Sequence, residues 1–145
     1  MNLEHITLSE WAQPNFRAVN KFYRSQKHKG SASGDERVFI ASYDDQVIAA
    51  VRLVPQQGFY WLRSLYVKNE LRGQHLGLAL LTLVRQQLTP TIYCFPYTHL
   101  EDFYQGAGYS PLASAQLPEP LQQLFVKYRG KGQGIICMVS SATNI

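Results

Sequence analysis

Residues 62–81 decide the fold of this chain, and they read Leu-Arg-Ser-Leu-Tyr-Val-Lys-Asn-Glu-Leu-Arg-Gly-Gln-His-Leu-Gly-Leu-Ala-Leu-Leu. The first six residues continue an apolar and aromatic run that begins at Phe59, which is typical of a strand. From Leu76 onward apolar residues recur every three or four positions, which predicts a helix that Pro90 ends. A strand therefore runs into a helix through Arg72-Gly73-Gln74-His75-Leu76-Gly77.

The start of that helix suits an anion. The first backbone N–H groups of a helix have no partner inside it, and the helix dipole adds partial positive charge there. A pyrophosphate binds well at such a place. Glycine lets phosphates approach the backbone, and Arg72 adds a charge-assisted hydrogen bond. The alternative is that Gly73 and Gly77 only allow close packing and that Arg72 is solvated.

The flanking segments predict a mixed sheet covered by helices. Asp44-Asp45 joins two β-branched segments as a two-residue hairpin turn. A strand, the central helix and a next strand form a crossover with parallel strands. The remaining loop at 29–35 either covers a cleft or is an idle linker. The expected strands are His5–Leu8, Arg37–Tyr43, Gln46–Val54, Phe59–Val67, Thr91–Phe95 and Gly134–Val139, the other helices are 14–27, 97–105 and 118–128, and the tail from Ser140 is expected to fray.

Composition bounds the class of protein. With 145 residues, the chain fits a single domain spanning 1–145. The net charge of +4 suits an anionic partner, but the basic residues are scattered, so nucleic acid is not expected. Cys94 and Cys137 lie in apolar contexts, which favours a cytoplasmic location over a disulfide framework. The start lacks a signal-peptide core and the longest apolar run is short of the about 20 residues that cross a bilayer, so no membrane partner is expected.

Two linked segments resemble the signature of GNAT-type N-acetyltransferases. The first is 62–81, and the second is Leu100-Glu101-Asp102-Phe103-Tyr104-Gln105-Gly106-Ala107-Gly108-Tyr109. The resemblance extends over 36–139 and is strongest from 59 to 109. It implies an α+β, mixed α/β fold with a mostly antiparallel twisted sheet of about six to seven strands, splayed between the fourth and fifth. It also implies transfer of an acetyl group from acetyl-CoA to a primary amine of a small molecule or peptide, by direct attack in a ternary complex.

The resemblance also implies roles for particular residues. The backbone near Leu65 and Val67, in a bulged strand, would pair with the pantetheine arm and stabilise the oxyanion. Tyr104 matches the tyrosine that donates a proton to the leaving thiolate, since a phenol keeps its proton at neutral pH. No residue is assigned to a metal. The implied contacts to coenzyme A come from Leu65, Tyr66, Val67, Arg72, Gly73, Gln74, His75, Leu76, Gly77 and Tyr97.

One departure concerns His75, which occupies the position of the first family glycine. A negative φ would accommodate the imidazole, whereas a positive φ would be costly. The favoured interpretation is a tolerated ring that points to solvent, and a bond from the ring to a phosphate is the alternative.

A second departure concerns the base. The family's strand glutamate is absent from Phe59-Tyr60-Trp61-Leu62. Glu36, His99 and Glu101 are candidate proton acceptors, but exposed surface positions explain them as well, so no base is assigned.

Three further residues have two interpretations each. Arg52 and Arg63 lie in apolar strands, where they either meet an acidic group of the substrate or face outward as surface residues. Cys94 is either an acyl-carrying nucleophile or, as favoured, a buried unreactive thiol.

Two other function classes stay open. A non-catalytic acyl-CoA-binding module is favoured by His75 and by the missing glutamate, and a nucleic-acid-binding domain rests only on the net charge. The acceptor and the oligomeric state are not determined, with a homodimer as one alternative.

Overall fold

A seven-stranded mixed sheet forms the centre of the computed structural model, which describes residues 3–132 and 134–140. The strands lie in the order β1-β2-β3-β4-β5-β7-β6. Their bounds are β1 Thr7–Glu10, β2 Arg37–Tyr43, β3 Gln46–Pro55, β4 Phe59–Val67, β5 Thr91–Cys94, β6 Tyr109–Pro111 and β7 Met138–Ser140. The α-helices are α1 Arg17–Ser25, α2 Leu76–Gln87, α3 Glu101–Gly106 and α4 Glu119–Gly130, and short 3-10 turns span Leu3–His5, Asn69–Leu71, Thr98–Leu100 and Ser114–Gln116.

The first four strands form an antiparallel meander. The hairpin between β2 and β3 turns at Asp44 and Asp45, which have φ values of 54° and 61°. Positive φ at both central residues is the geometry of a type I′ turn, which follows the twist of the strands. The hairpin predicted from Asp44-Asp45 is therefore confirmed.

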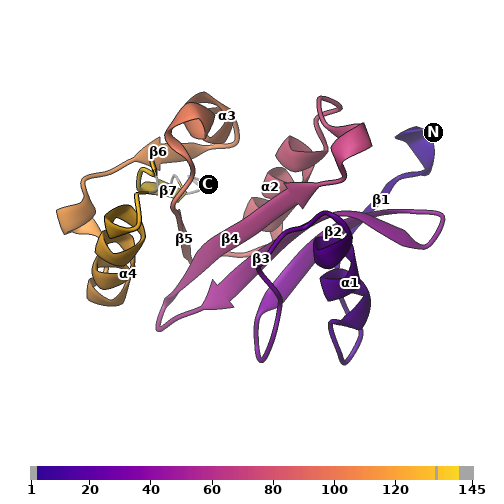
Figure 1. Cartoon of the computed structure of the whole chain (residues 1–145), viewed down its shortest axis with the longest axis horizontal. Helices are drawn as coiled ribbons and strands as arrows, with labels where there is room; N and C mark the ends of the chain where they lie inside the picture. The colour runs from indigo at the N-terminus through magenta and orange to yellow at the C-terminus, as the bar shows by residue number, and fades with distance from the viewer. Residues whose placement is uncertain (1–2, 133, 141–145) are drawn as a thin grey trace.

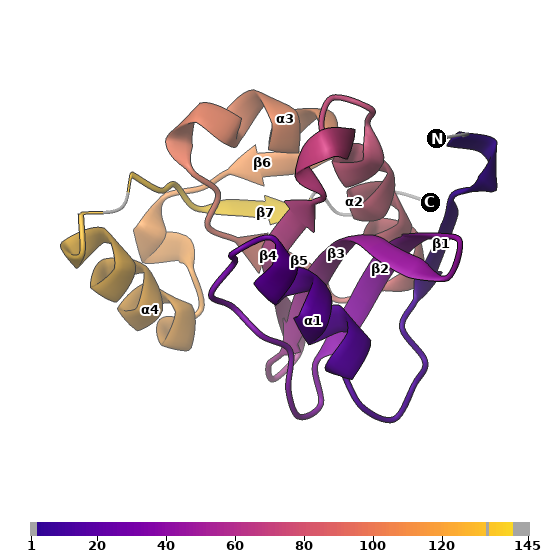
Figure 2. The ribbon, with the colours of Figure 1, turned by 45° about the vertical axis from the view of Figure 1, so that its right-hand side comes forward.

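Helices cover both faces of the sheet (Figures 1 and 2). On one face, α2 packs its buried leucines onto β2, β3 and β4 in the main core cluster. On the other face, α1 packs over β2 and β3, and α4 packs over Trp61. Because side chains alternate along a strand, Ala50, Arg52 and Val54 of β3 face α1 and α4, whereas Val51 and Leu53 face α2.

The sheet splays between β4 and β5, as the resemblance implies. The two strands run parallel, and their pairing ends at Leu62 and Cys94. Beyond this point β4 continues to Val67 beside β3, while the chain after β5 turns toward the segment before β7, where Ile136 N–H donates to the Pro96 carbonyl at 3.0 Å. Figure 1 shows the far end of β4 diverging from the segment that holds β5, α3 and β7.

A bulge interrupts β4 just after the splay begins. Arg52 of β3 pairs with Arg63, but Ala50 pairs with Tyr66, so Val51 faces two residues of β4 instead of one. Ser64, the first of these two, has a φ of 59°. An extra residue in one strand bends it and redirects its side chains. Arg63 and Ser64 consequently both project toward the α1 face, where Ser64 Oγ and Arg52 Nη1 are 3.0 Å apart.

Several predicted bounds were wrong. Strand β6 was not predicted, because three residues are too few to show an alternating pattern. The helix expected over 97–105 is a 3-10 turn followed by the short α3. The first strand starts two residues later than expected, and the last is confined to Met138–Ser140. The tail after Ser140 lies outside the described residues.

No helix in the described part of the chain has the length and apolar character needed to cross a bilayer.

Candidate functional site

The first turn of α2 exposes its backbone donors. The first α-helical hydrogen bond runs from Ala79 N–H to the His75 carbonyl at 3.0 Å, so the N–H groups of Leu76, Gly77 and Leu78 have no acceptor within the helix. No side chain caps this end of α2. The preceding residues, 72–75, are exposed. A phosphate group therefore fits here without displacing a protein partner.

The two glycines of the junction have different roles. Gly73 has a φ of 84°, and nothing lies within 4 Å of the position where a Cβ would be, so its role is conformational. At Gly77 a Cβ would lie 3.2 Å from Phe103 Cζ and 3.8 Å from Leu65 Cδ2. Gly77 thus lets α2 pack closely against α3 and β4, which is the packing role considered from the sequence. The same contact brings Leu65 and Gly77 together.

His75 adopts the costly backbone conformation. Its φ is 64°, so the negative φ that would accommodate the imidazole is not found. Histidine is one of the residues that enter this region more often than most, but an L-residue still loses about 1–2 kcal/mol there. The side chain is exposed, as favoured from the sequence, and borders a hollow between β1 and α2 that includes Leu8, Leu78 and Leu83.

Arg72 lies beside β4. Its Nε donates to the Val67 carbonyl at 3.3 Å, and its guanidinium carbon lies 4.9 Å from the centre of the Tyr66 ring. These contacts bring Arg72, Tyr66 and Val67 together at the end of β4. Among the described residues the terminal guanidinium nitrogens have no hydrogen-bond acceptor, so they can bond an anion at the same place.

Tyr104 is the buried residue of α3, and its ring lies near β5 and β6. Its side chain is 6% exposed and its ring meets those of Phe103 and Tyr109 nearly at right angles. Burial first, and then Cys94 and Tyr109, raise the pKa of Tyr104, so its hydroxyl keeps its proton. The neighbouring Tyr109 hydroxyl is buried and has no hydrogen-bond partner among the described residues. This cluster can donate hydrogen bonds to an atom that enters the splay.

Tyr97 does not lie with the other predicted contacts on α2. It is 52% exposed, its ring stacks on His99 with 6.0 Å between centroids, and its backbone forms an isolated bridge with Ile135. It stands on the β7 side of the splay.

A buried polar cluster lies on the opposite face of β4. Glu36 accepts two bonds from Arg52, at 2.8 and 3.0 Å, and the two side chains are 9% and 7% exposed. Arg52 Nη1 donates to Ser64 Oγ at 3.0 Å, and His28 Nε2 lies 3.0 Å from the same oxygen. The Tyr23 hydroxyl donates to the Ser64 carbonyl at 2.7 Å. We name these five residues the Ser64 cluster.

Sequence reasoning missed His28, Ser64 and Tyr23. The one available signal was Arg52, a charged residue within an apolar strand, which implies a buried partner. The interpretations of Glu36 as an exposed carboxylate and of Arg52 as an outward-facing residue were wrong, because the two form a buried ion pair.

Arg63 and Cys94 have defined surroundings. The Arg63 guanidinium carbon lies 4.2 Å from the centre of the Trp61 ring, and Nη2 donates to the Tyr128 hydroxyl at 3.1 Å. Cys94 is 1% exposed and burial raises the pKa of its thiol, which agrees with the unreactive interpretation.

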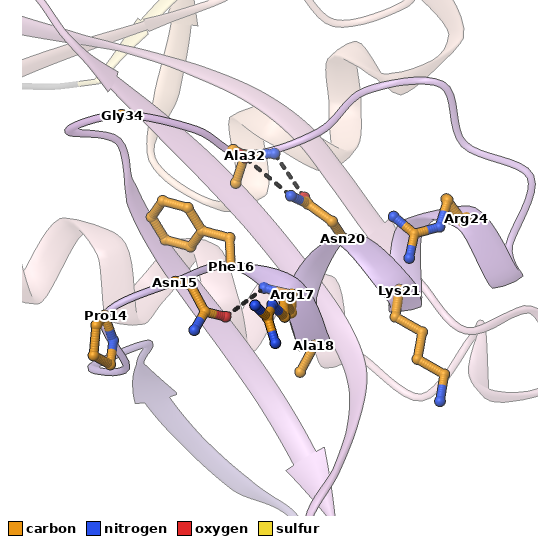
Figure 3. Close-up of a pocket in the computed structure, with 10 residues that line it drawn as sticks. All are labelled: Pro14, Asn15, Phe16, Arg17, Ala18, Asn20, Lys21, Arg24, Ala32 and Gly34. Carbon is orange, nitrogen blue, oxygen red and sulfur yellow. Dashed lines mark hydrogen bonds between the residues drawn. The ribbon is translucent and has the colours of Figure 1, made fainter.

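A hollow beside α1 is shown in Figure 3, and no residue of the junction lines it. Asn20 fixes one of its walls, because its side chain exchanges two hydrogen bonds with the backbone of Ala32, at 2.7 and 3.0 Å. The loop after α1 is thereby tied back to α1. The hollow is lined by Pro14, Asn15, Phe16, Arg17, Ala18, Asn20, Lys21, Arg24, Ala32 and Gly34.

Comparisons with known proteins agree with this geometry. A family model described as an acetyltransferase (GNAT) domain matches residues 34–111. No curated protein matches the chain. The chain is similar in structure to N-acetylglutamate synthase from Neisseria gonorrhoeae, complexed with coenzyme A and N-acetyl-glutamate, with a TM-score of 0.71 and 13% identity over 96% of this chain. It spans only 35% of that synthase chain.

Two shorter structures match along almost their whole length. Escherichia coli ElaA has a TM-score of 0.65 and 17% identity, and the match covers 94% of this chain and 99% of ElaA. An aminoglycoside 6'-N-acetyltransferase complexed with coenzyme A has a TM-score of 0.70 and 15% identity, with 96% and 98% coverage. At these identities the likeness establishes the fold.

Proposed function

This chain belongs to the GNAT acetyltransferase family, and from that premise we propose that it transfers the acetyl group of acetyl-CoA to a primary amine of a small molecule or peptide. The observation that carries the proposal is the uncapped N-terminus of α2. This helix follows β4, the strand that continues beyond the point where its pairing with β5 ends. Coenzyme A in the two similar structures supports the choice of donor.

The donor would be held mainly by backbone. The free N–H groups at Leu76, Gly77 and Leu78 face an anion at the positive end of α2, and Arg72 adds a charge from the end of β4. Acetyl-CoA supplies an activated acetyl thioester. The open edge of β4 after Leu62 offers main-chain groups to the pantetheine arm, as an added strand would use them.

Two groups would assist the acyl transfer. Main-chain N–H groups of the bulge, near Leu65, would stabilise the developing oxyanion. Tyr104 would donate to the departing sulfur. Because burial raises the pKa of Tyr104, its hydroxyl offers a hydrogen bond to the sulfur more readily than a complete proton transfer.

The test has two steps. Calorimetric titration with acetyl-CoA measures donor binding, and absence of binding at millimolar concentration would contradict the proposal. An amine panel, assayed for free coenzyme A, then separates an enzyme from a module that binds the donor without catalysis. Donor binding without thiol release from any amine would favour that second candidate, which the missing strand glutamate and His75 support.

A further inference from the structure

Contacts from three other segments converge on Ser64. The hydroxyl of Tyr23, in α1, donates to the Ser64 carbonyl, and Arg52 of β3 donates to Ser64 Oγ. His28, in the loop after α1, lies beside the same oxygen. Ser64 itself has a φ of 59°, a region that L-residues avoid. A strained residue that its surroundings hold in place is a reason to look for a function.

The directions of the hydrogen bonds follow from the groups involved. A guanidinium only donates, so Ser64 Oγ accepts from Arg52. The Arg52 charge is compensated by two bonds to Glu36. A neutral His28 that carries its proton on Nδ1 accepts, at Nε2, a hydrogen bond from the Ser64 hydroxyl. One lone pair of Ser64 Oγ then remains for an incoming N–H.

The surroundings of His28 favour its neutral form. Its ring lies between those of Tyr23 and Tyr66, with centroids 5.0 and 5.3 Å away. Burial is the largest cause that lowers the pKa of His28, followed by the charges of Arg52 and Arg63, with Glu36 bound to Arg52. A proton acceptor must be unprotonated before the reaction, and this environment meets that condition at neutral pH.

Ser64 lies at the start of the splay, beside the main-chain groups proposed above to bind the donor thioester. It is the second residue past Leu62, the last residue of β4 that pairs with β5. Its side chain is on the α1 face, whereas the next residue, Leu65, packs near Gly77 on the α2 face. The proposed donor site and the Ser64 cluster therefore lie on opposite faces of the bulge in β4.

The loop after α1 packs against the pair of His28 and Ser64. A Cβ on Gly30 would lie 2.8 Å from His28 Nε2, 2.8 Å from Ser64 Oγ and 3.0 Å from Arg52 Nη1. A side chain at this position would displace these groups, so the absence of a side chain at Gly30 lets the loop pack against the half-buried pair.

We propose that Ser64 and His28 form the proton acceptor for the amine, with Ser64 Oγ touching the nitrogen and His28 acting through it. This inference rests on the proposed function. As the nitrogen bonds to the acetyl carbon and the carbon–sulfur bond breaks, the nitrogen loses one proton to Ser64 Oγ. The hydroxyl proton moves to His28 Nε2, and the sulfur leaves as a thiolate that accepts a hydrogen bond from Tyr104. The half-buried His28 returns its proton to solvent.

Two variants test the relay, each measured for kcat, KM, pH profile and acetyl-CoA affinity. His28→Gln removes the acceptor, and Ser64→Gly removes the hydroxyl while suiting the positive φ. We expect kcat to fall about 100-fold in each, the lower end of what general base catalysis contributes, with acetyl-CoA affinity unchanged. In the wild type kcat/KM should fall on the acid side of the ordinary histidine range, because burial lowers the pKa of His28 and the protonated ring cannot accept, and His28→Gln should lack this acid limb.

His5→Gln is the matched control, since His5 is exposed in the turn before β1, and its rate and pH profile should stay as in the wild type. Retention of turnover within about threefold in both variants, or an unchanged acid limb in His28→Gln, overturns the relay while the proposed function stands. A wild-type protein that binds no acetyl-CoA overturns the proposed function, and the relay with it. Unchanged acetyl-CoA affinity in a variant shows that its fold is retained.

Discussion

The two faces of β4 beyond Leu62 present different chemical groups. On the α2 face, the junction at 72–77 offers backbone N–H groups and exposed side chains. Gly73 allows its positive φ, and Gly77 allows close packing. On the α1 face, the Ser64 cluster consists of side chains from separate segments that bond one another in a largely buried place. A backbone site tolerates changes of side chain, whereas a cluster of interdependent side chains does not.

The largest effect should therefore arise in the Ser64 cluster. Glu36→Ala leaves the buried Arg52 unpaired, and we expect unfolding free energy to fall by about 3–5 kcal/mol. Glu10→Ala is the matched control, because it removes the partner of Arg37 in a pair that is 38% and 34% exposed, and exposed pairs contribute about 0.2–1 kcal/mol. Urea unfolding measures both. Equal losses would show that burial does not distinguish the two ion pairs.

Tyr104→Phe should reduce turnover with little change in donor affinity. The variant removes only the hydroxyl, and we expect kcat to fall at least about 100-fold, or about 2.7 kcal/mol in the barrier. Steady-state rates and calorimetric acetyl-CoA affinity separate the two effects. Tyr104→Phe with wild-type turnover would remove the proposed role of the hydroxyl.

Arg72→Ala tests whether side chains add to the backbone site. If the guanidinium bonds a phosphate, acetyl-CoA binding should weaken by about 1.5–3 kcal/mol, as for hydrogen bonds to charged groups. Arg17→Ala on the outer side of α1 removes the same charge away from the junction and should leave the affinity unchanged. An unaltered dissociation constant for Arg72→Ala would show that the Arg72 side chain adds nothing to the binding by backbone N–H groups.

The smallest effect should come from the backbone conformation at position 75. Because His75 has a φ of 64°, His75→Gly should stabilise the protein by about 1 kcal/mol. Gly73→Ala is the reciprocal change, since its φ is 84° and no atom would clash with the new Cβ, so only the backbone strain is added. Thermal unfolding should show opposite signs. Destabilisation by His75→Gly would mean that the imidazole makes a contact worth more than the strain.

The comparison of the two faces also explains which parts could be predicted. Helix α2 and the strand before it follow from local periodicity, and the turn at Asp44-Asp45 follows from residue type, so these were correct from the sequence. The junction was found because its residues are contiguous. Strand β6 was missed, because it depends on pairing with β7 instead of on its own pattern.

By itself, the sequence determined the order of the central elements, the family and the position of the strand-to-helix junction, because each of these depends on residues close together along the chain. The tertiary structure alone decided the backbone conformation of His75, the separate roles of Gly73 and Gly77, and the Ser64 cluster. His28 and Ser64 are 36 residues apart. Only the packing of α1 and its loop onto the bulge of β4 brings the two side chains within hydrogen-bonding distance, and no local pattern encodes that packing.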